Sequence, residues 1–294
     1  MTLKAPLLVL AGASLWGIIG LFVQGLYQFG FTPIDVVAVR AGGSALVLFV
    51  FLALFKRHLL VIQLRDLPFF AGCGILSIAF FNLCFFTVIE RSSNSLAVVL
   101  LYTGPIFVVL LSRLFFKEPL TGGKSIALLL TVAGCGLAVG LFPAGSGNVS
   151  AVTVGIGLLS GFFYALYSIF GKFVAGRYHS VTITAYAMLT ASLFVVPMSG
   201  LSGKMNDLAQ TGVLVNSGGL VLLSTIAAYI LYTAGLAKME SGRAAILATA
   251  EPVVAIFIGV LLFGDSLSRW QLAGIACILG AVFFTIERRR AVAA

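Results

Sequence analysis

Two ionisable side chains, Arg40 and Glu251, lie within stretches of the sequence that are otherwise apolar. A charged side chain at the centre of a membrane-spanning helix costs about 2.5–3.5 kcal/mol, so it usually faces a partner or a cavity. Because burial favours the neutral form of a carboxyl group, Glu251 is the candidate for proton coupling. Together, Arg40 and Glu251 could bracket a zwitterion. The alternative is structural, with Glu251 bonded to a neighbouring helix and Arg40 to backbone carbonyls.

Aromatic rings and hydroxyls form a second group of candidates. One stripe keeps polar or small side chains on a single helix face, at i, i+4, i+7, i+8 and i+11: Ser160, Tyr164, Tyr167, Ser168 and Gly171. Similar candidates lie elsewhere in the sequence: Trp16, Asn82, Asn94, Tyr102, Thr225, Tyr229 and Tyr232. The tyrosines lie too deep in their segments for the aromatic belt of a membrane surface. With Arg40 and Glu251, these residues predict the lining of a cavity for a small amphipathic solute. Hydrogen bonding between helices is the alternative.

Residues for catalysis or metal binding do not occur at a usable spacing. The four cysteines lie in apolar runs without a second Cys or His nearby: Cys73, Cys84, Cys135 and Cys277. An intramembrane enzyme would need paired Asp residues, a Ser with a His or Lys, or a His–Glu metal set at membrane depth. His58 and His179 instead fall in predicted loops. We expect no enzyme activity, no metal and no cofactor, and packing roles for the cysteines.

The composition indicates that these candidates lie in lipid. Of the 294 residues, 61% are hydrophobic and 9% are charged, whereas a soluble globular protein has about 25% charged residues. A soluble domain of this size would need a wettable exterior that this sequence does not supply. This excludes a cytosolic enzyme, a nucleic-acid-binding protein and a disulfide-stapled secreted domain. The expected partners are the lipid bilayer and a small-molecule substrate, and no nucleic acid.

Ten apolar segments are long enough to cross a membrane, which needs about 20 residues of α-helix. They lie near residues 5–28, 34–55, 67–89, 93–115, 121–141, 151–175, 181–201, 213–236, 242–263 and 268–287. The connections between them are too short to fold into soluble domains. The sequence therefore predicts an all-α integral membrane protein with ten transmembrane helices.

The distribution of Lys and Arg predicts the orientation of these helices. If the N-terminus is cytoplasmic and the helices alternate, three basic residues fall on the outer side, Arg91, Lys204 and Arg269, and Arg40 lies within a helix. The other basic residues all fall on the cytoplasmic side, as they do in cytoplasmic loops generally. We expect a multi-pass protein of the cytoplasmic (inner) membrane with both termini in the cytoplasm.

The two halves of the sequence repeat at a shift of 147 residues. This shift places Arg91 on Lys238, Ala97 on Ala244, Pro105 on Pro252, Leu114 on Leu261, Glu118 on Asp265 and Leu120 on Leu267. The repeat predicts one five-helix unit at residues 1–145 and a second at residues 146–294. Because five is an odd number, the second unit crosses the membrane in the opposite sense. Inverted repeats are typical of transporters that work by alternating access around a midplane site.

The repeat pairs two prolines and two acidic residues. Pro105 and Pro252 each lack an amide hydrogen and clash with the preceding turn, so each predicts a kink. Paired kinks are candidate hinges, and packing is the alternative. Glu118 and Asp265 lie at turns just before the next predicted helix, where a carboxylate favours the helix N-terminus. We expect both acidic residues to be structural.

Several motifs together resemble the EamA family of the drug/metabolite transporter superfamily. In the first half they are Leu15-Trp16-Gly17, Val39-Arg40-Ala41, Leu101-Tyr-Thr-Gly-Pro105 and Phe116-Lys-Glu118-Pro-Leu-Thr121. In the second half they are Ala244-Ala-Ile-Leu-Ala-Thr-Ala-Glu-Pro252, Leu261-Leu-Phe-Gly-Asp265-Ser-Leu267 and Leu272-Ala-Gly274. The resemblance implies two inverted five-helix halves, with helices 1, 3, 4, 6, 8 and 9 around a central cavity. The chain departs from a symmetric pattern, because Gly104 precedes Pro105 where Glu251 precedes Pro252. Within the superfamily it looks most like exporters of amino acids and related metabolites.

These observations favour a secondary-active exporter of a small polar or zwitterionic metabolite, in the first place an amino acid. The sequence has no nucleotide-binding loop, so energy would come from the solute gradient or from protons. A facilitative, uncoupled transporter is an alternative. A nucleotide-sugar or phosphometabolite exchanger is another, although it would need several cations in its cavity. An intramembrane enzyme is a remote third. Such a chain contains both halves and would work as a monomer or weak homodimer.

Overall fold

The computed structural model describes residues 4–138, 150–204, 206–263 and 267–287, and this part of the chain is helical without a strand. Eight helical segments in it are long and apolar enough to cross a membrane: Lys4–Gln28, Pro33–Phe55, Leu64–Arg91, Leu96–Phe116, Ala151–Val174, Ser180–Met198, Thr211–Leu236 and Ser241–Leu262. Two shorter apolar helices, Gly122–Ala138 and Arg269–Thr285, occupy the fifth and tenth predicted segments. The protein is therefore a multi-pass membrane protein, and the count of ten spans stays a prediction.

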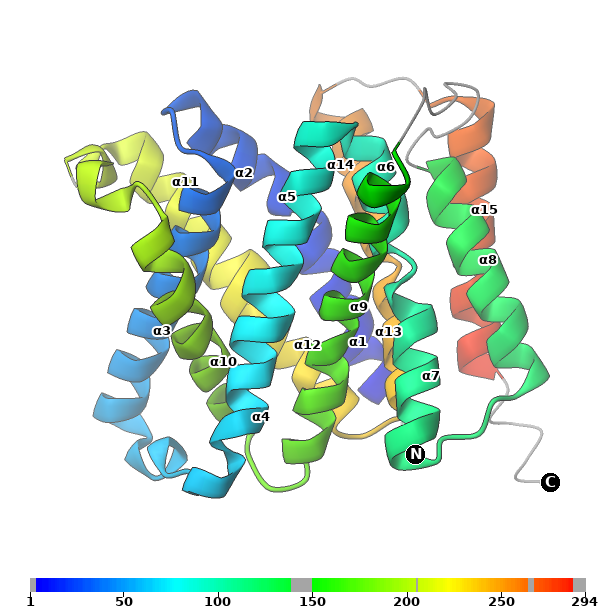
Figure 1. The fold of residues 1–294 in the computed structure, drawn as a ribbon, viewed down its shortest axis with the longest axis horizontal. Coiled ribbons are helices and arrows are strands. Elements are labelled where there is room, and N and C mark those ends of the chain that lie inside the picture. The colour runs from blue at the N-terminus through cyan, green and yellow to red at the C-terminus, as the bar shows by residue number, and fades with distance from the viewer. Residues whose placement is uncertain (1–3, 139–149, 205, 264–266, 288–294) are drawn as a thin grey trace.

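Most of the long segments are interrupted, so they consist of more than one helix. The helices are α1 Lys4–Gly17, α2 Ile19–Gln28, α3 Pro33–Phe55, α4 Leu67–Ala71, α5 Phe81–Arg91, α6 Asn94–Leu101, α7 Gly104–Phe116, α8 Gly122–Ala138, α9 Ala151–Val174, α10 Ser180–Val195, α11 Thr211–Val221, α12 Ala228–Leu236, α13 Ser241–Ala248, α14 Glu251–Phe263 and α15 Arg269–Glu287 (Figure 1). Two π-helical segments, Gly72–Phe80 and Leu222–Ala227, join α4 to α5 and α11 to α12. Such segments are frequent at functional sites.

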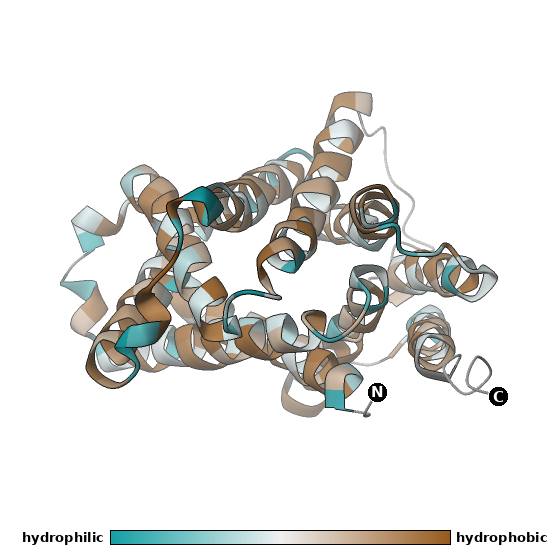
Figure 2. Ribbon diagram, turned by 90° about the horizontal axis from the view of Figure 1, so that it is seen from below, coloured by the Kyte–Doolittle hydropathy of each residue, from teal (hydrophilic) through white to brown (hydrophobic). Residues whose placement is uncertain are grey.

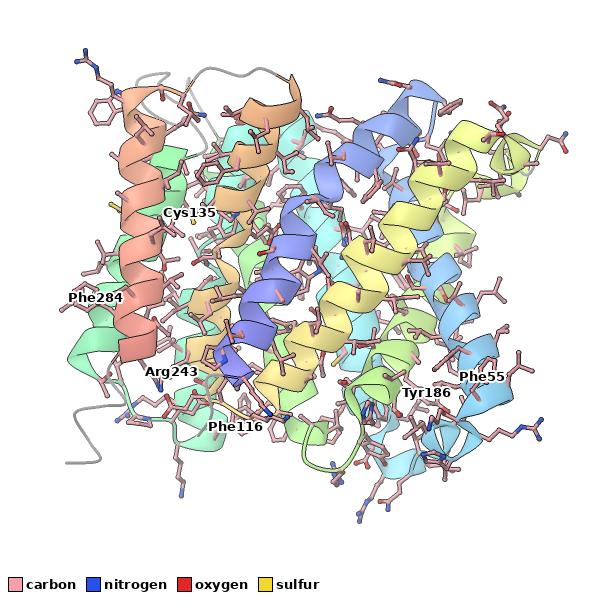
Figure 3. All side chains as sticks on the ribbon, turned by 180° about the vertical axis from the view of Figure 1, so that it is seen from behind. Phe55, Phe116, Cys135, Tyr186, Arg243 and Phe284 are labelled. Carbon is pink, nitrogen blue, oxygen red and sulfur yellow. The ribbon has the colours of Figure 1, made fainter. Side chains whose placement is uncertain are left out.

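The helices form one bundle with an apolar outer surface. Hydrophilic residues lie mainly at helix ends and connections (Figure 2). Phe55 and Phe284 project from the outside of the bundle and are 68% and 44% exposed, as expected for side chains that face lipid (Figure 3). The start of α1 and the end of α15 lie at the same edge, the lower edge of Figure 1. We call the described residues 4–138 the first half and residues 150–287 the second half.

Corresponding helices of the two halves begin 147 residues apart. The pairs of first residues are Pro33 and Ser180, Asn94 and Ser241, Gly104 and Glu251, and Gly122 and Arg269. The two π-helical segments also end at this interval, at Phe80 and Ala227. The secondary structure therefore keeps the register that the sequence repeat has.

One helix of each half pairs with its counterpart at either edge of the bundle. At one edge α3 packs on α10, and at the other α8 packs on α15 (Figure 1). In the α3–α10 pair, Asp35 accepts hydrogen bonds from the Gly200 amide (2.8 Å) and from Lys204 (2.8 Å) beyond the end of α10. At the opposite end, Thr182, which is 147 residues after Asp35, donates to the Leu59 carbonyl (2.9 Å) beyond the end of α3. The start of α3 thus binds the segment that follows α10, and the start of α10 binds the segment that follows α3.

Small residues allow close contact in the α8–α15 pair. A side chain built on Gly134 would lie 3.0 Å from the Gly274 carbonyl oxygen, and one on Gly274 would lie 2.6 Å from the Gly134 carbonyl oxygen. The contact at Gly274 is too short for a side-chain carbon, and the contact at Gly134 would require the neighbouring helix to shift. Such contacts are typical of helix packing in lipid, where dispersion forces replace the hydrophobic effect.

Both prolines lie where their spans are interrupted, although the interruption is a break between two helices instead of a kink in one, and their role as hinges stays a prediction. The helix breaks before each of them, at Tyr102–Thr103 and at Thr249–Ala250, and Pro105 and Pro252 fall in the first turn of the next helix. An amide hydrogen is not needed there, so proline is tolerated. The Thr103 and Thr249 hydroxyls donate to the carbonyls three residues earlier, each at 2.6 Å, and so add a second hydrogen bond to carbonyls that already accept the Thr103 and Thr249 amides.

Glu118 caps a helix of the other half instead of the helix that follows it. Its carboxylate accepts hydrogen bonds from the amides of Ser241 and Gly242 at the start of α13. The side chain of Thr121 caps α8 by accepting from the Lys124 amide (3.3 Å). The sequence correctly indicates a helix N-terminus as the partner but predicts the wrong helix. Asp265 lies outside the described residues.

Candidate functional site

A cavity enclosing about 290 Å³ of space between atoms, part of it open to solvent, lies between the halves. Its walls come from α1, the first π-helical segment, α5, α9 and α12, so both halves contribute. The lining residues are Trp16, Ser77, Phe81, Tyr164, Tyr167, Ser168, Tyr229 and Tyr232. Every one of these side chains is an aromatic ring or a hydroxyl, and none carries a charge.

The rings of the cavity wall pack against one another. The centroid of Trp16 lies 5.1 Å from that of Tyr229, at an interplanar angle of 76°, and 5.2 Å from that of Tyr232. Tyr167 lies 4.9 Å from Tyr229 at 75°. The Trp16–Tyr229 and Tyr167–Tyr229 pairs are edge-to-face and the Trp16–Tyr232 pair is tilted, and such aromatic pairs each contribute roughly 0.5–1.5 kcal/mol beyond the area they bury. The cluster therefore holds Trp16 of the first half against tyrosines of the second.

Two hydroxyl pairs fix the tyrosines on their helices. The hydroxyls of Ser168 in α9 and Tyr232 in α12 are 2.7 Å apart, and those of Tyr167 and Thr233 are 2.9 Å apart. Both pairs join α9 to α12 and leave their members satisfied without any charged group. Buried hydroxyls that bond one another in this way hold a defined wall geometry.

Other donors around the cavity have no protein partner. The Trp16 indole nitrogen is buried and makes no hydrogen bond, and Trp16 is 7% exposed. Among the described residues, the hydroxyls of Ser77 and Tyr164 also form no hydrogen bond. An unpaired buried donor costs about 1–3 kcal/mol, so a bound molecule that accepts from these groups would gain by it. The cavity thus offers donors to a carbonyl or carboxylate.

Arg40 supports the cavity wall from behind. Its Nε donates to Thr225 Oγ1 (3.1 Å), and its guanidinium donates to the Tyr229 hydroxyl (3.2 Å) and lies 5.5 Å from the ring centroid. Thr225 in turn donates to the Leu220 carbonyl (2.8 Å), five residues earlier, within the second π-helical region. Arg40 is therefore held by side chains, and neither bonds backbone carbonyls, as the structural alternative predicted, nor lines the cavity. Its role as a direct solute ligand stays a prediction.

Replacing Arg40 should affect solute affinity through Tyr229. We expect Arg40→Met to raise the KM for transport about fivefold to tenfold, the effect of losing a charge-assisted hydrogen bond that orients a binding residue. The maximal rate should change less. The measurement is the concentration dependence of solute uptake into proteoliposomes, with Thr225→Val as a milder variant of the same contact. Equal KM values for Arg40→Met and the unmodified protein would contradict this role.

Glu251 begins α14 at the second helix break and also lies outside the cavity lining. Its backbone carbonyl packs on Gly17 of α1, where a side-chain carbon would come within 2.7 Å of it. Its carboxylate is close enough to Arg40, Tyr102 and Tyr164 for electrostatic interaction, but forms no hydrogen bond or ion pair with the described residues. The predicted bond to a neighbouring helix is therefore not found, and proton coupling stays a prediction.

Two other residues that were predicted to line the cavity, Tyr102 and Asn82, have their contacts elsewhere. Tyr102 is buried in an apolar cluster with Cys135, Val253 and Ile278, and Asn82 donates to the Ile78 carbonyl (2.6 Å) of its own segment. The side chain of Asn94 is outside the described part of the structure. Trp16, Tyr164, Tyr167, Ser168, Tyr229 and Tyr232 do lie together around the cavity, and their contact with a solute stays a prediction.

Two cavity residues are absent from the sequence prediction, Ser77 and Phe81. They are four residues apart and share a helix face, and Ser77 is a lone hydroxyl in an apolar run, which is a usable signal. The described residues contain no group of three or more His, Cys, Asp or Glu side chains that could hold a metal ion.

Together, the apolar membrane spans and the cavity between them are the features of a multi-pass membrane transporter. The EamA-like transporter family matches residues 3–140 and again residues 152–286, and the chain belongs to this family.

An uncharacterized transporter of Archaeoglobus fulgidus is 25% identical over 278 residues, covering 94% of this chain and 96% of its own length. The threonine/homoserine exporter RhtA of Escherichia coli is 26% identical over 281 residues, covering 95% and 90%. The uncharacterized inner membrane transporter YicL of Salmonella typhimurium is 26% identical over 302 residues, covering 100% and 99%. A crystal structure with 16% identity superposes at a TM-score of 0.80 over 100% of both chains and shares the fold.

Proposed function

We propose that the protein exports a small amphipathic metabolite, in the first place an amino acid, from the cytoplasm by alternating access. The observation that carries this proposal is the cavity wall. It combines aromatic rings with hydroxyl and indole donors and has no charged lining residue. A wall of this kind suits a solute of zero net charge that has an apolar part.

The wall has a group for each part of such a solute. The unpaired donors of Trp16, Ser77 and Tyr164 would receive a carboxylate. The faces of the aromatic rings attract an ammonium group by cation–π interaction and cover an apolar side chain. The relative RhtA is a threonine/homoserine exporter, and this adds support for amino acids.

A phosphorylated metabolite or nucleotide sugar fits the same wall poorly. A buried phosphate needs cationic partners, because an unpaired charge in a low-dielectric site is strongly destabilised. Among the described residues, no Lys or Arg lines the cavity, and the nearby Arg40 is already bound to Thr225 and Tyr229. This alternative therefore ranks below the amino acid.

Two inverted halves are part of the proposal. The 147-residue interval between matching helix starts and the double match to the family support the repeat. The antiparallel contacts of Asp35 and Thr182 support the inversion. We place the lower edge of Figure 1 in the cytoplasm, since the start of α1 with Lys4 and the end of α3 next to Arg57 lie there. Both halves belong to one chain, so we propose a functional monomer.

The test is counterflow in proteoliposomes with a panel of labelled solutes. Leucine, phenylalanine and threonine should exchange, and glucose 6-phosphate should not. Phenylalaninol retains the ring and the ammonium but lacks the carboxylate, so it should compete with phenylalanine at least about tenfold less well, since donors in the wall would be left unpaired. Exchange of the sugar phosphate without exchange of any amino acid would overturn the proposal. Uptake that rises linearly with concentration and shows no counterflow would favour a channel-like facilitator.

A further inference from the structure

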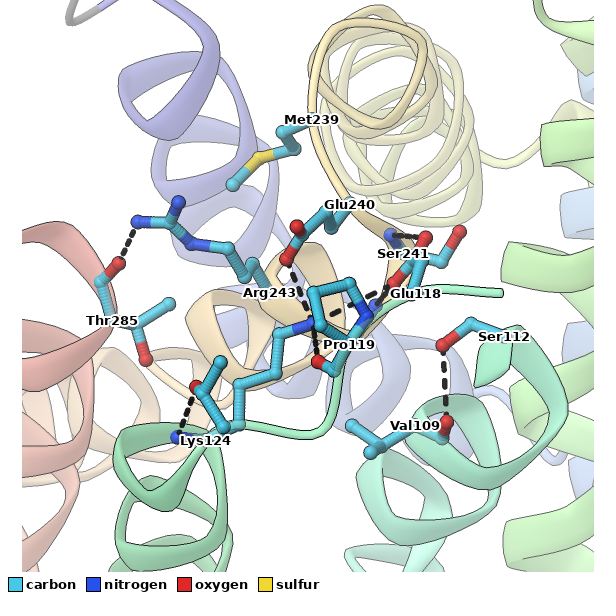
Figure 4. Close-up of polar contacts among 12 residues, drawn as sticks. Val109, Ser112, Glu118, Pro119, Lys124, Met239, Glu240, Ser241, Arg243 and Thr285 are labelled. Atoms are coloured by element: carbon cyan, nitrogen blue, oxygen red, sulfur yellow. Dashed lines mark hydrogen bonds and ion pairs between the residues drawn. The ribbon is translucent and has the colours of Figure 1, made fainter. Parts of the chain in front are cut away.

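A cluster of buried polar contacts between the two halves at the lower edge surrounds the start of α13. Glu118, in the segment between α7 and α8, accepts hydrogen bonds from the amides of Ser241 (2.7 Å) and Gly242 (3.2 Å) (Figure 4). The first amides of a helix have no partner within it and form its positive end, so a carboxylate there is doubly favourable. Glu118 is 8% exposed, which shields this contact from water.

Lys124 of α8 joins the same cluster from the first half. Its ammonium lies 2.7 Å from Glu240, just before α13, and 4.0 Å from Glu118, and it also donates to the Pro119 carbonyl (2.8 Å). Lys124 is 8% exposed as well. Glu118 and Lys124 therefore hold the start of α13 from the first half through both a carboxylate and an ammonium group. We call these two residues and their contacts with residues 240–242 the α13 latch.

The α13 latch lies below the cavity. From Ser168, the lowest cavity residue of α9, one further turn leads to Lys172, which donates to the carbonyls of Leu236 (2.8 Å) and Met239 (2.6 Å). In the second half, Leu236 at the end of α12 is four residues after the cavity residue Tyr232, and Glu240 follows four residues later in the connection to α13. Beyond the latch, α13 packs on α7, and Ala245 lies in a buried cluster with Val108, Ala165 and Ile169. α13 thus joins α7 of the first half at the same edge of the bundle as the α13 latch.

We propose that the α13 latch holds the cytoplasmic end of the transporter closed and must release α13 before the cavity opens to that side. This inference rests on the proposed alternating access. Glu118 and Lys124 act through α13 and do not touch the solute. They are positioning residues for the closed inner end, and weakening them favours the inward-open state.

A cap that is only structural would stabilise the fold without a preference for one state, so the test must separate the two roles. The reporter is Ala245→Cys in a variant whose four native cysteines are replaced. The readout is its rate of labelling by a membrane-impermeant thiol reagent in inside-out vesicles. We expect Glu118→Gln and Lys124→Gln each to raise this rate about tenfold, as expected when charge-assisted hydrogen bonds are lost from the closed state alone.

Asp66 provides the matched control. It is also a buried acid that joins the two halves at the lower edge, bound to Arg177 (2.8 Å) and to the Tyr178 hydroxyl (2.7 Å), but it does not contact α13. Asp66→Asn should lower the melting temperature and leave the labelling rate of the Ala245→Cys reporter unchanged. Conservative Glu118→Asp should restore slow labelling in part. If Glu118→Gln lowers the melting temperature as Asp66→Asn does and labelling stays slow, the latch is overturned.

Hydrogen–deuterium exchange on the protein with its native cysteines gives an independent reading. Glu118→Gln should speed exchange in residues 241–248 relative to α15, and unchanged exchange would also contradict the latch. Neither measurement requires a transported solute. If the solute panel gives no counterflow while Glu118→Gln accelerates labelling, the substrate assignment fails and the latch stands.

Discussion

Replacing Trp16 with alanine should reduce amino acid counterflow at least about tenfold, because a cluster of aromatic contacts and an unpaired donor are lost together. Trp16 contacts the rings of Tyr229 and Tyr232 at 5.1 and 5.2 Å and is the aromatic wall residue that α1 contributes. The measurement is the initial rate of labelled phenylalanine or leucine exchange in proteoliposomes at equal amounts of inserted protein.

Two further variants separate the causes of this loss. Trp16→Phe keeps a ring but has no indole nitrogen, so it should retain more exchange than alanine while discriminating less between phenylalanine and phenylalaninol. Trp270→Ala is the control, since this second tryptophan lies at the start of α15 and is 49% exposed on the lipid side. Trp270→Ala should leave exchange near normal. Exchange by Trp16→Ala within twofold of the unmodified protein would remove Trp16 from the site.

Glu251→Gln should abolish the response of transport to an imposed pH gradient while exchange at equal pH persists. The carboxyl group lies at a helix break within the membrane-spanning region and has no hydrogen-bond or ion-pair partner among the described residues. Glutamine has almost the same shape but cannot take up or release a proton, so the wall is preserved and only the coupling is removed. The measurement is net uptake against a gradient, driven by a pH step across the vesicle membrane.

Glu90→Gln is the matched control for Glu251, because Glu90 lies in an exposed position near the end of α5. It should retain the full response to the pH step. An undiminished response in Glu251→Gln would refute the coupling role of this residue. If the unmodified protein itself exchanges solute but ignores the pH step, transport is facilitative.

The positions of the membrane-spanning segments in the sequence were predictable, because local hydropathy depends on composition alone. The expected segment 151–175 is α9 at Ala151–Val174, and the expected 121–141 is α8 at Gly122–Ala138. The apolar count does not locate the breaks at Tyr102–Thr103 and Thr249–Ala250, but the two prolines predict a disruption close to both, as a kink instead of a break. The turn-forming Thr-Gly-Pro at 103–105 is a local signal that could reveal the first of them.

The tyrosines at helical spacing were the predictable part of the site. Tyr164, Tyr167 and Ser168 share a face, and that face does border the cavity. Asn82 and Tyr102 were assigned on residue type, but helix rotation decides which side faces inward, and it is set by neighbours far away in sequence. The π-helical segment Gly72–Phe80 adds to this, since it changes the angular position of every residue after it. The partner of Glu118 lies more than a hundred residues away, beyond the reach of local patterns.

The paired helices at both edges of the bundle limit how the protein can move. Each of these pairs, α3 with α10 and α8 with α15, takes one helix from each half, and the second is joined through Gly134 and Gly274 at backbone contact. If one entire half rotated as a rigid body against the other, the helices of both pairs would have to slide past each other at the same time. We therefore expect these two helix pairs to stay fixed during transport. Bending at the interrupted central helices would then open the cavity first to one side of the membrane and then to the other.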